Sequence, residues 1–231
     1  MKLIGIVGGI GPESTIDYYR LFISIYRARK PDGGYPAVLI DSIDLAKVLK
    51  LVSSGDLGGL AAYMLEEVRR LARAGATHAL LSSNTPHIVF DDIQRASPIP
   101  LISIVETVCR AAVERKLKRV GLFGTRFTMQ GGFYQTVFAR EGIGVVIPEP
   151  GDQEFIHDTY LNELVNGILR TETRNRYAAV ARQMKARQGI EALILGGTEL
   201  PLLLRDATDV GVALLDTAHL HVERAVSELL S

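Results

Sequence analysis

The chain has 231 residues, of which 47% are hydrophobic and 23% charged, a composition that fits one large globular domain or two small ones. Lysine plus arginine equal aspartate plus glutamate at 26 each, so no net charge favours a general nucleic-acid binder or a membrane-surface protein. The single cysteine, Cys109, excludes an internal disulfide and is typical of a cytoplasmic protein.

The first half of the chain alternates short apolar runs with helical patterns. The runs are rich in Ile, Leu and Val, and they predict strands covered on both faces at 3–7, 37–41, 77–82 and 99–104. The first run, broken by glycines, is expected to be a strand rather than a signal peptide. Helices are predicted between the strands at 13–29, 57–74 and 88–96.

The second half repeats this order. Strands are predicted at 119–123, 144–147, 190–195 and 212–215, and helices at 129–141, 154–169, 174–188 and 218–230. IGIVGG at residue 4 matches VGLFGT at 120, LLSSNT at 80 matches ILGGTE at 194, and LISI at 101 matches LLDT at 214. The offsets of 116, 114 and 113 differ only by loop-sized amounts, and they predict an internal duplication.

This alternation predicts an α/β fold with two parallel sheets and right-handed crossovers. We expect a first domain of residues 1–104 plus 212–231 and a second domain of residues 105–211. Ligands of such sheets bind beyond the carboxyl ends of the strands. The glycine-rich and polar segments at those ends are therefore the candidate site, expected in a cleft between the two domains.

The first such segment contains Gly8, Gly9, Ile10 and Gly11. Its spacing is neither the dinucleotide fingerprint nor a P-loop. It is interpreted as a close approach of the backbone to a small anion at a helix N-terminus. The alternative is a set of tight turns that allow strand and helix to pack.

The duplication places Ser83-Asn84-Thr85 opposite Gly197-Thr198-Glu199, and Thr125 follows a third strand. Hydroxyls, an amide and exposed N–H groups in these segments are suited to a carboxylate. The alternative is helix capping, since Pro86 and Pro201 follow at early helical positions.

Two residues near these segments are candidate general bases, Glu199 and His87. The alternatives are an acid stabilised by a helix dipole for Glu199 and a side chain bonded to a nearby carbonyl for His87. His157, like His87, is either a candidate general base or a side chain bonded to a nearby carbonyl. Cys109 follows the apolar spacing of a helix and is interpreted as a buried small hydrophobe. No Cys/His cluster indicates a metal, and His219 and His221 do not share a helical face.

Several segments together resemble the aspartate/glutamate racemase family of PLP-independent amino-acid racemases. They span residues 3 to about 225 in the family's order and read GIVGGIGPEST, SSNTPH, GTRFTM, GGTELPLL and LDTAHLHVERAV. The resemblance implies two doubly wound, Rossmann-like domains related by a pseudo-twofold, and a homodimer. It also implies removal and return of the proton next to a carboxylate without a cofactor.

Members of this family use two cysteines, one from each half, on opposite faces of the substrate. The matching positions here are Ser83 and Gly197. A serine hydroxyl is a far weaker acid than a thiol and needs an adjacent base, and glycine has no group that carries a proton. The two-thiol route of the family is therefore not expected in this chain.

Three functions follow, all with a small amino acid or carboxylate as partner. The first is an isomerase acting on an acidic amino acid, bound through residues shared by both halves: Gly9, Ile10, Gly11, Asn84, Thr85, Thr125 and Thr198. The second is a lyase or isomerase that does not racemise and uses one base. The third is a carboxylate-binding protein without chemistry. Lys47 and Arg126 are possible partners for a side-chain carboxylate, or else solvated surface.

Overall fold

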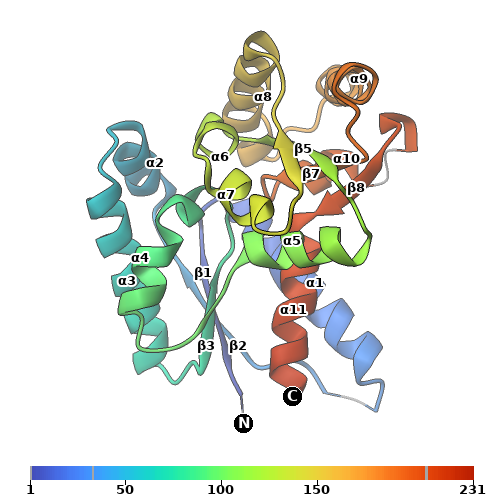
Figure 1. Cartoon of the computed structure of the whole chain (residues 1–231). Helices are drawn as coiled ribbons and strands as arrows, with labels where there is room; N and C mark the ends of the chain where they lie inside the picture. Colours follow the sequence, from blue (N-terminus) through green and yellow to red (C-terminus); the bar gives the residue numbers. More distant parts are fainter. Residues whose placement is uncertain (1, 33, 206–207) are drawn as a thin grey trace. The chain divides into compact units, whose positions relative to one another are not determined.

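The computed structural model describes residues 2–32, 34–205 and 208–231, which form two parallel sheets flanked by helices (Figure 1). The first sheet has the strand order β2-β1-β3-β4 and the second β6-β5-β7-β8. The two orders are the same under the offset seen in the sequence, and every pairing is parallel. The α/β class and the two duplicated sheets predicted from the sequence are confirmed.

The first four strands are β1 (Ile4–Gly8), β2 (Val38–Ser42), β3 (His78–Leu81) and β4 (Leu101–Ile102). The helical segments between them are α1 (Pro12–Arg29), α2 (Leu45–Ser53), α3 (Leu57–Arg73), η1 (Thr85–Val89) and α4 (Phe90–Ala96). Helix α2 is not among the sequence predictions. It begins at Asp44, whose side chain accepts a hydrogen bond from the Ala46 N–H, a standard N-cap.

The strands of the second sheet are β5 (Arg119–Gly124), β6 (Gly144–Val146), β7 (Ala192–Gly196) and β8 (Ala213–Asp216). The helical segments of the second half are α5 (Ile104–Glu114), α6 (Arg126–Gln130), α7 (Phe133–Ala139), α8 (Pro150–Asn162), η2 (Leu164–Asn166), α9 (Thr171–Gln188), α10 (Leu200–Leu204), η3 (Thr208–Val210) and α11 (Thr217–Leu230). The single helix predicted at 129–141 is in fact two, because Gly132 has a left-handed φ of 77° that interrupts the helix.

The chain divides into two compact units, residues 1–104 with 218–231 and residues 105–217. The boundary near the C-terminus differs from the one expected at residue 212. Strand β8 pairs with β7, from Ala192 opposite Ala213 to Leu195 opposite Asp216, so it belongs to the second sheet. The backbone N–H and C=O groups of a buried strand need a neighbouring strand, and β7 supplies it. Helix α11, which follows β8, packs in the first unit.

In the first unit, helices α1 and α11 bury their apolar faces against the sheet. Their side chains form one cluster with strand residues: Ile4, Ile6, Tyr18, Leu21, Phe22, Leu80, Ile102, Ala218, Val222, Ala225 and Val226. Burial of a Val, Leu, Ile or Phe side chain stabilises the fold by about 1.5–3 kcal/mol before entropy costs. The carboxyl ends of β1 and β3 lie next to each other, with Val7 paired opposite Leu81.

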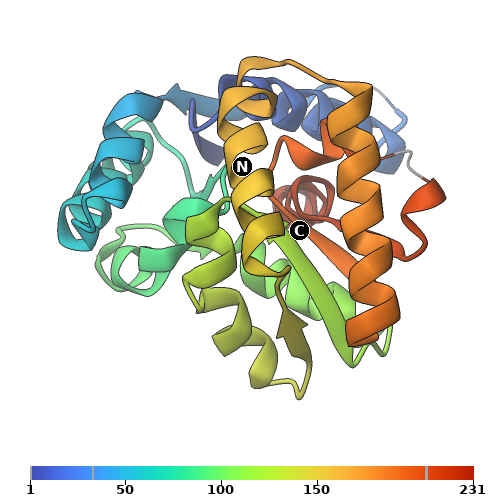
Figure 2. The ribbon, with the colours of Figure 1, turned by 90° about the horizontal axis from the view of Figure 1, so that it is seen from above.

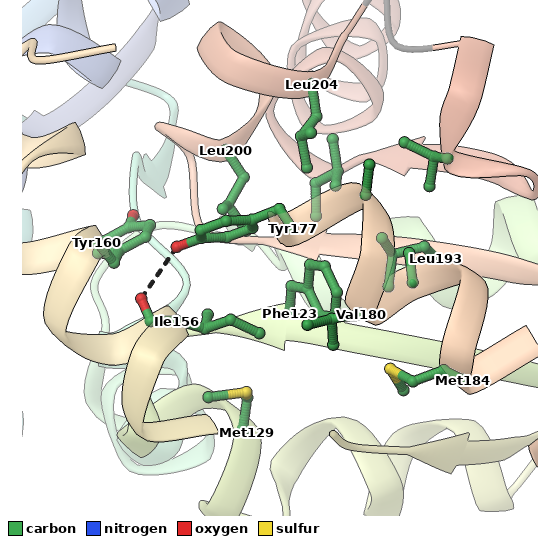
Figure 3. Packing of buried hydrophobic residues seen from close by; sticks show 14 of the residues in the cluster. Phe123, Met129, Ile156, Tyr160, Tyr177, Val180, Met184, Leu193, Leu200 and Leu204 are labelled. Carbon is green, nitrogen blue, oxygen red and sulfur yellow. Dashed lines mark hydrogen bonds between the residues drawn. The ribbon is translucent and has the colours of Figure 1, made fainter. Parts of the chain in front are cut away.

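In the second unit, helices α8 and α9 lie side by side over one face of the sheet (Figure 2). Tyr177, Ile156 and Tyr160 extend from these helices into a core with Phe123 and Leu193 of the strands (Figure 3). The Tyr177 hydroxyl donates to the Ile156 carbonyl at 3.0 Å, and a dashed line marks this bond in Figure 3. Among the described residues, no helix is long and apolar enough to cross a membrane.

Candidate functional site

The loop after β1 is held by the helix that follows it. The Gly9 N–H donates to Thr15 Oγ1 at 2.8 Å, and Ser14 Oγ donates to the Gly11 carbonyl at 2.8 Å. A Cβ on Gly9 would lie 2.3 Å from the Ile43 carbonyl oxygen, so the chain requires glycine there. The Gly9 N–H therefore already has an acceptor within the chain. Ile10 is buried, and a substrate anion at Gly9, Ile10 and Gly11 stays a prediction.

The segment after β3 is buried throughout. Ser83, Asn84 and Thr85 all lie at the carboxyl end of the first sheet, where the sequence placed them. The Ser83 carbonyl is hydrogen-bonded to the Nδ1 of His87 at 3.0 Å. Among the described residues, no basic side chain lies within hydrogen-bonding distance of the Ser83 hydroxyl, and a serine without such a base is a poor acid–base group.

His87 uses both of its ring nitrogens within the fold. Nδ1 faces the Ser83 carbonyl and must carry the proton, and Nε2 accepts the Ile104 N–H at 3.2 Å. Burial lowers the pKa of His87 to about 3, with a further contribution from nearby His221. The ring is only 3% exposed. This geometry favours the structural interpretation of His87 over that of a general base.

A second buried histidine supports the same segment, a role that its sequence pattern did not indicate. His221 Nε2 donates to the Ile102 carbonyl at 2.8 Å, and Nδ1 accepts from the Tyr18 hydroxyl at 3.0 Å. Burial lowers its pKa to about 4. Two neutral histidines therefore hold residues 102–104, where β4 ends and α5 begins.

In the second unit, the side chain of Thr125 caps a helix. Its Oγ1 accepts the Thr128 N–H at 3.2 Å and so begins α6. His157 Nδ1 accepts the Arg126 N–H at 3.2 Å, and its pKa is lowered by burial and by the charge of Arg126. The N-terminus of α6 is thus satisfied by groups of this unit. Lys47, which with Arg126 is a possible partner for a side-chain carboxylate, is exposed. Its Nζ lies 3.7 Å from the centre of the Tyr63 ring.

Gly197 follows β7 and faces the ring of Tyr160. A Cβ at position 197 would lie 2.3 Å from Tyr160 Cε2, 2.8 Å from Cζ and 2.9 Å from the hydroxyl oxygen. Real Cβ atoms do not approach other atoms this closely, so any side chain at 197 would need the Tyr160 ring to move. The space beside residue 197 is filled by the phenol of Tyr160.

Glu199 is the carboxylate of this strand end, and its side chain does not cap α10. It is 1% exposed, and Tyr160 is 6% exposed. The Tyr160 hydroxyl donates to Glu199 Oε2, and Thr198 Oγ1 lies 3.3 Å from the same oxygen. Sequence reasoning found Glu199 but missed Tyr160, because 39 residues separate the two and nothing in the pattern of the α8 segment distinguishes this tyrosine from a core residue.

Cys109 lies on α5 and is 4% exposed. Burial raises the pKa of its thiol to about 11, and the charges of Glu141 and Glu106 add to this. The interpretation of Cys109 as a buried small hydrophobe is confirmed. No group of three or more metal-ligating side chains occurs within 2–32, 34–205 and 208–231.

We expect the native chain to react with a disulfide reagent at pH 8 at least about 100-fold more slowly than the urea-unfolded chain. The reason is that the Cys109 thiol has an ordinary pKa in the unfolded chain and is far more ionised at pH 8 than in the folded chain. Release of the reagent's coloured thiol measures the rate directly, since this is the chain's single cysteine. Equal rates in native and unfolded protein would contradict the burial of Cys109.

Comparison with known proteins agrees with this architecture. The family model described as Asp/Glu/Hydantoin racemase matches residues 7–225. The broad specificity amino-acid racemase RacX of Bacillus subtilis is 27% identical over 184 residues, covering 72% of this chain and 69% of the relative. The crystal structure of an aspartate racemase homologue from Pyrococcus horikoshii has a TM-score of 0.84 and 33% identity, with both chains fully covered.

A crystal structure of an Asp/Glu racemase candidate from Yersinia pestis has a TM-score of 0.89 and 32% identity, again over 100% of both chains. An aspartate racemase from Picrophilus torridus shares the fold, with a TM-score of 0.77 at 19% identity over 98% of this chain and 95% of its own. The family model, the duplicated sheets and the full-length structural matches lead to one conclusion: the chain belongs to the Asp/Glu/hydantoin racemase family.

Proposed function

We propose that the chain binds a small acidic amino acid or a related carboxylate at its strand ends and moves the substrate's α-proton without a cofactor. In this proposal Glu199 is the general base. The observation that carries it is a carboxylate, 1% exposed, at the carboxyl end of β7 in a member of a racemase family. Ligands of parallel sheets bind at such ends, and carboxylates are competent bases.

The proposed route differs from the two-thiol route that the resemblance implies. Ser83 stands at the first thiol position, and Gly197 at the second. The phenol of Tyr160 occupies the space of a side chain at 197, so no acid or base can extend from that residue. A carboxylate two residues further along the chain supports a reaction in which the proton is exchanged on one face of the substrate.

The polar groups at the strand ends are the proposed substrate contacts. Asn84, Thr85 and Thr198 are buried and carry hydroxyl or amide groups suited to a carboxylate. The relatives include a broad specificity amino-acid racemase and an aspartate racemase homologue, which supports an amino acid as the substrate class. Oligomeric state and cellular location stay predictions, a homodimer and the cytoplasm, which light scattering and cell fractionation would test.

The test is α-proton exchange in deuterated water. Purified protein is incubated separately with L-aspartate, D-aspartate, L-glutamate and D-glutamate, and proton NMR follows loss of the α-proton while chiral chromatography follows inversion. We expect exchange with retention for at least one enantiomer. Glu199→Gln should reduce the exchange rate by about 10²–10⁴-fold, the usual contribution of a positioned base.

The matched control is Glu154→Gln, the same substitution at an exposed glutamate on α8, which should exchange at the unmodified rate. Exchange with inversion would favour racemisation by two groups, and breakdown of the substrate would favour a lyase. Thermal stabilisation by these amino acids without any exchange would favour the carboxylate-binding function and exclude the proposed chemistry.

A further inference from the structure

The buried contact between Tyr160 and Glu199 joins two distant parts of the second unit. Tyr160 lies on α8 and Glu199 precedes α10. Both side chains are almost completely buried, and the hydroxyl of one bonds the carboxyl of the other. Burying a carboxylate without hydrogen-bond partners would cost several kcal/mol. The Tyr160 hydroxyl, as a donor to Glu199, reduces this cost.

The direction of this hydrogen bond follows from the chemistry of the pair. Burial raises the pKa of Tyr160 well above its ordinary value, and the charge of Glu199 raises it further. The phenol therefore keeps its proton at neutral pH and donates to Glu199 Oε2. A phenol that does not ionise is a weak acid and is unavailable as a base, so Tyr160 can affect proton transfer only through the carboxylate it holds.

The ring of Tyr160 has a second effect at the same strand end. It lies where a side chain on residue 197 would project, with Cε2 only 2.3 Å from that Cβ position. Thr198 approaches the same carboxylate oxygen from the neighbouring position in the chain. Two hydroxyls thus reach Glu199 Oε2, and the ring closes the space beside it.

We propose that Tyr160 is a positioning residue that occupies the volume of the side chain missing at residue 197 and orients the Glu199 carboxylate for proton transfer. The inference rests on the proposed function, because it assigns Glu199 the proton-transfer step. It adds that residues 160 and 199 together fill the place at the end of β7 where a side chain on residue 197 would otherwise lie.

The chain offers a matched control for this role. Tyr177 lies in the same core cluster and is buried, and its hydroxyl donates to the Ile156 carbonyl (Figure 3) and lies 3.0 Å from Thr159 Oγ1. Tyr160→Phe and Tyr177→Phe each remove one buried hydroxyl and keep the ring. Both variants test the loss of a buried hydroxyl, but only Tyr160→Phe removes a donor to Glu199.

We expect Tyr160→Phe to lower the α-proton exchange rate by about 10-fold or more with little change in KM, since a displaced base acts mainly in the transition state. The acidic limb of the pH–rate profile should move to higher pH, because a donor to the charged form of the carboxylate has been removed. Tyr177→Phe should leave both the rate and the profile unchanged.

A second measurement does not depend on activity. The melting temperature is compared for Tyr160→Phe in the unmodified chain and in Glu199→Gln. A hydrogen bond to a charged group should make the loss roughly 5 °C in the first background and clearly smaller in the second. The loss from Tyr177→Phe should be the same in both backgrounds.

Equal losses from Tyr160→Phe in both backgrounds, or an exchange rate and pH profile like those of Tyr177→Phe, would overturn the inference while leaving the proposed function intact. Absence of exchange in the unmodified chain would instead reject the proposed function, and the assignment of Tyr160 to proton transfer with it. The two failures are therefore distinguishable.

Discussion

Replacement of Gly197 by cysteine is expected to lower the free energy of unfolding by about 3 kcal/mol, at the upper end of the cost of overpacking a core. The added Cβ would lie 2.3 Å from Tyr160 Cε2. The ring cannot easily move away, because it packs in the core cluster and its hydroxyl bonds Glu199. Differential scanning calorimetry should show a melting temperature lower by roughly 6–12 °C.

Gly144→Cys is the matched control. Gly144 lies on β6 of the same unit, and the nearest atom to a Cβ there is 3.8 Å away, an ordinary contact. This variant should cost less than about 1 kcal/mol. Tyr160→Ala should reduce the additional cost of Gly197→Cys by removing the ring. Equal stability of the two cysteine variants would contradict the position of Tyr160.

The Tyr160 ring beside residue 197 also changes the result expected when cysteines are introduced at the family's two positions. From the sequence alone, Ser83→Cys combined with Gly197→Cys predicts a gain of racemisation. The structure places the Tyr160 ring where the Cβ of a cysteine at residue 197 would lie. We therefore expect racemisation in the triple variant that adds Tyr160→Ala, and little or none in the double variant. Chiral chromatography of aspartate and glutamate would distinguish them.

The second large effect is a loss of stability in mild acid. The pKa of His87 is lowered to about 3 and that of His221 to about 4 in the folded chain, against about 6.5 when unfolded. Below pH 6.5 the unfolded chain binds protons that the folded chain does not, so stability falls as the pH falls toward 4. Each histidine contributes about 1.4 kcal/mol per pH unit in that window.

Lowering the pH from 7 to 5 should therefore cost roughly 4 kcal/mol from the two histidines together. Urea unfolding at a series of pH values measures this slope. NMR titration provides a check without mutation: the ring signals of His87 and His221 should not titrate between pH 8 and 5. Titration of His87 near its ordinary pKa would refute its role as a buried neutral acceptor.

Much of the fold could be predicted because it depends on local pattern. Buried parallel strands are continuous apolar runs, and strand ends carry glycine and small polar residues, so β1, β5 and β7 were found within one or two residues. The division of one predicted helix into α6 and α7 was missed, although Gly131-Gly132 was visible in the sequence. The local pattern could not predict which sheet contains β8, because a strand's partner is determined by hydrogen bonding across the sheet.

By itself, the sequence determined the duplicated α/β architecture, the family and the strand ends at which Ser83, Gly197 and Glu199 lie. Only the tertiary structure decided what those residues contact. His87 is held between the Ser83 carbonyl and the Ile104 N–H, and Gly197 faces a ring that lies 37 positions earlier in the chain. Such contacts depend on how helices pack on a sheet, and the pattern of residues along a helix specifies which face is buried but not which side chain fills a given space.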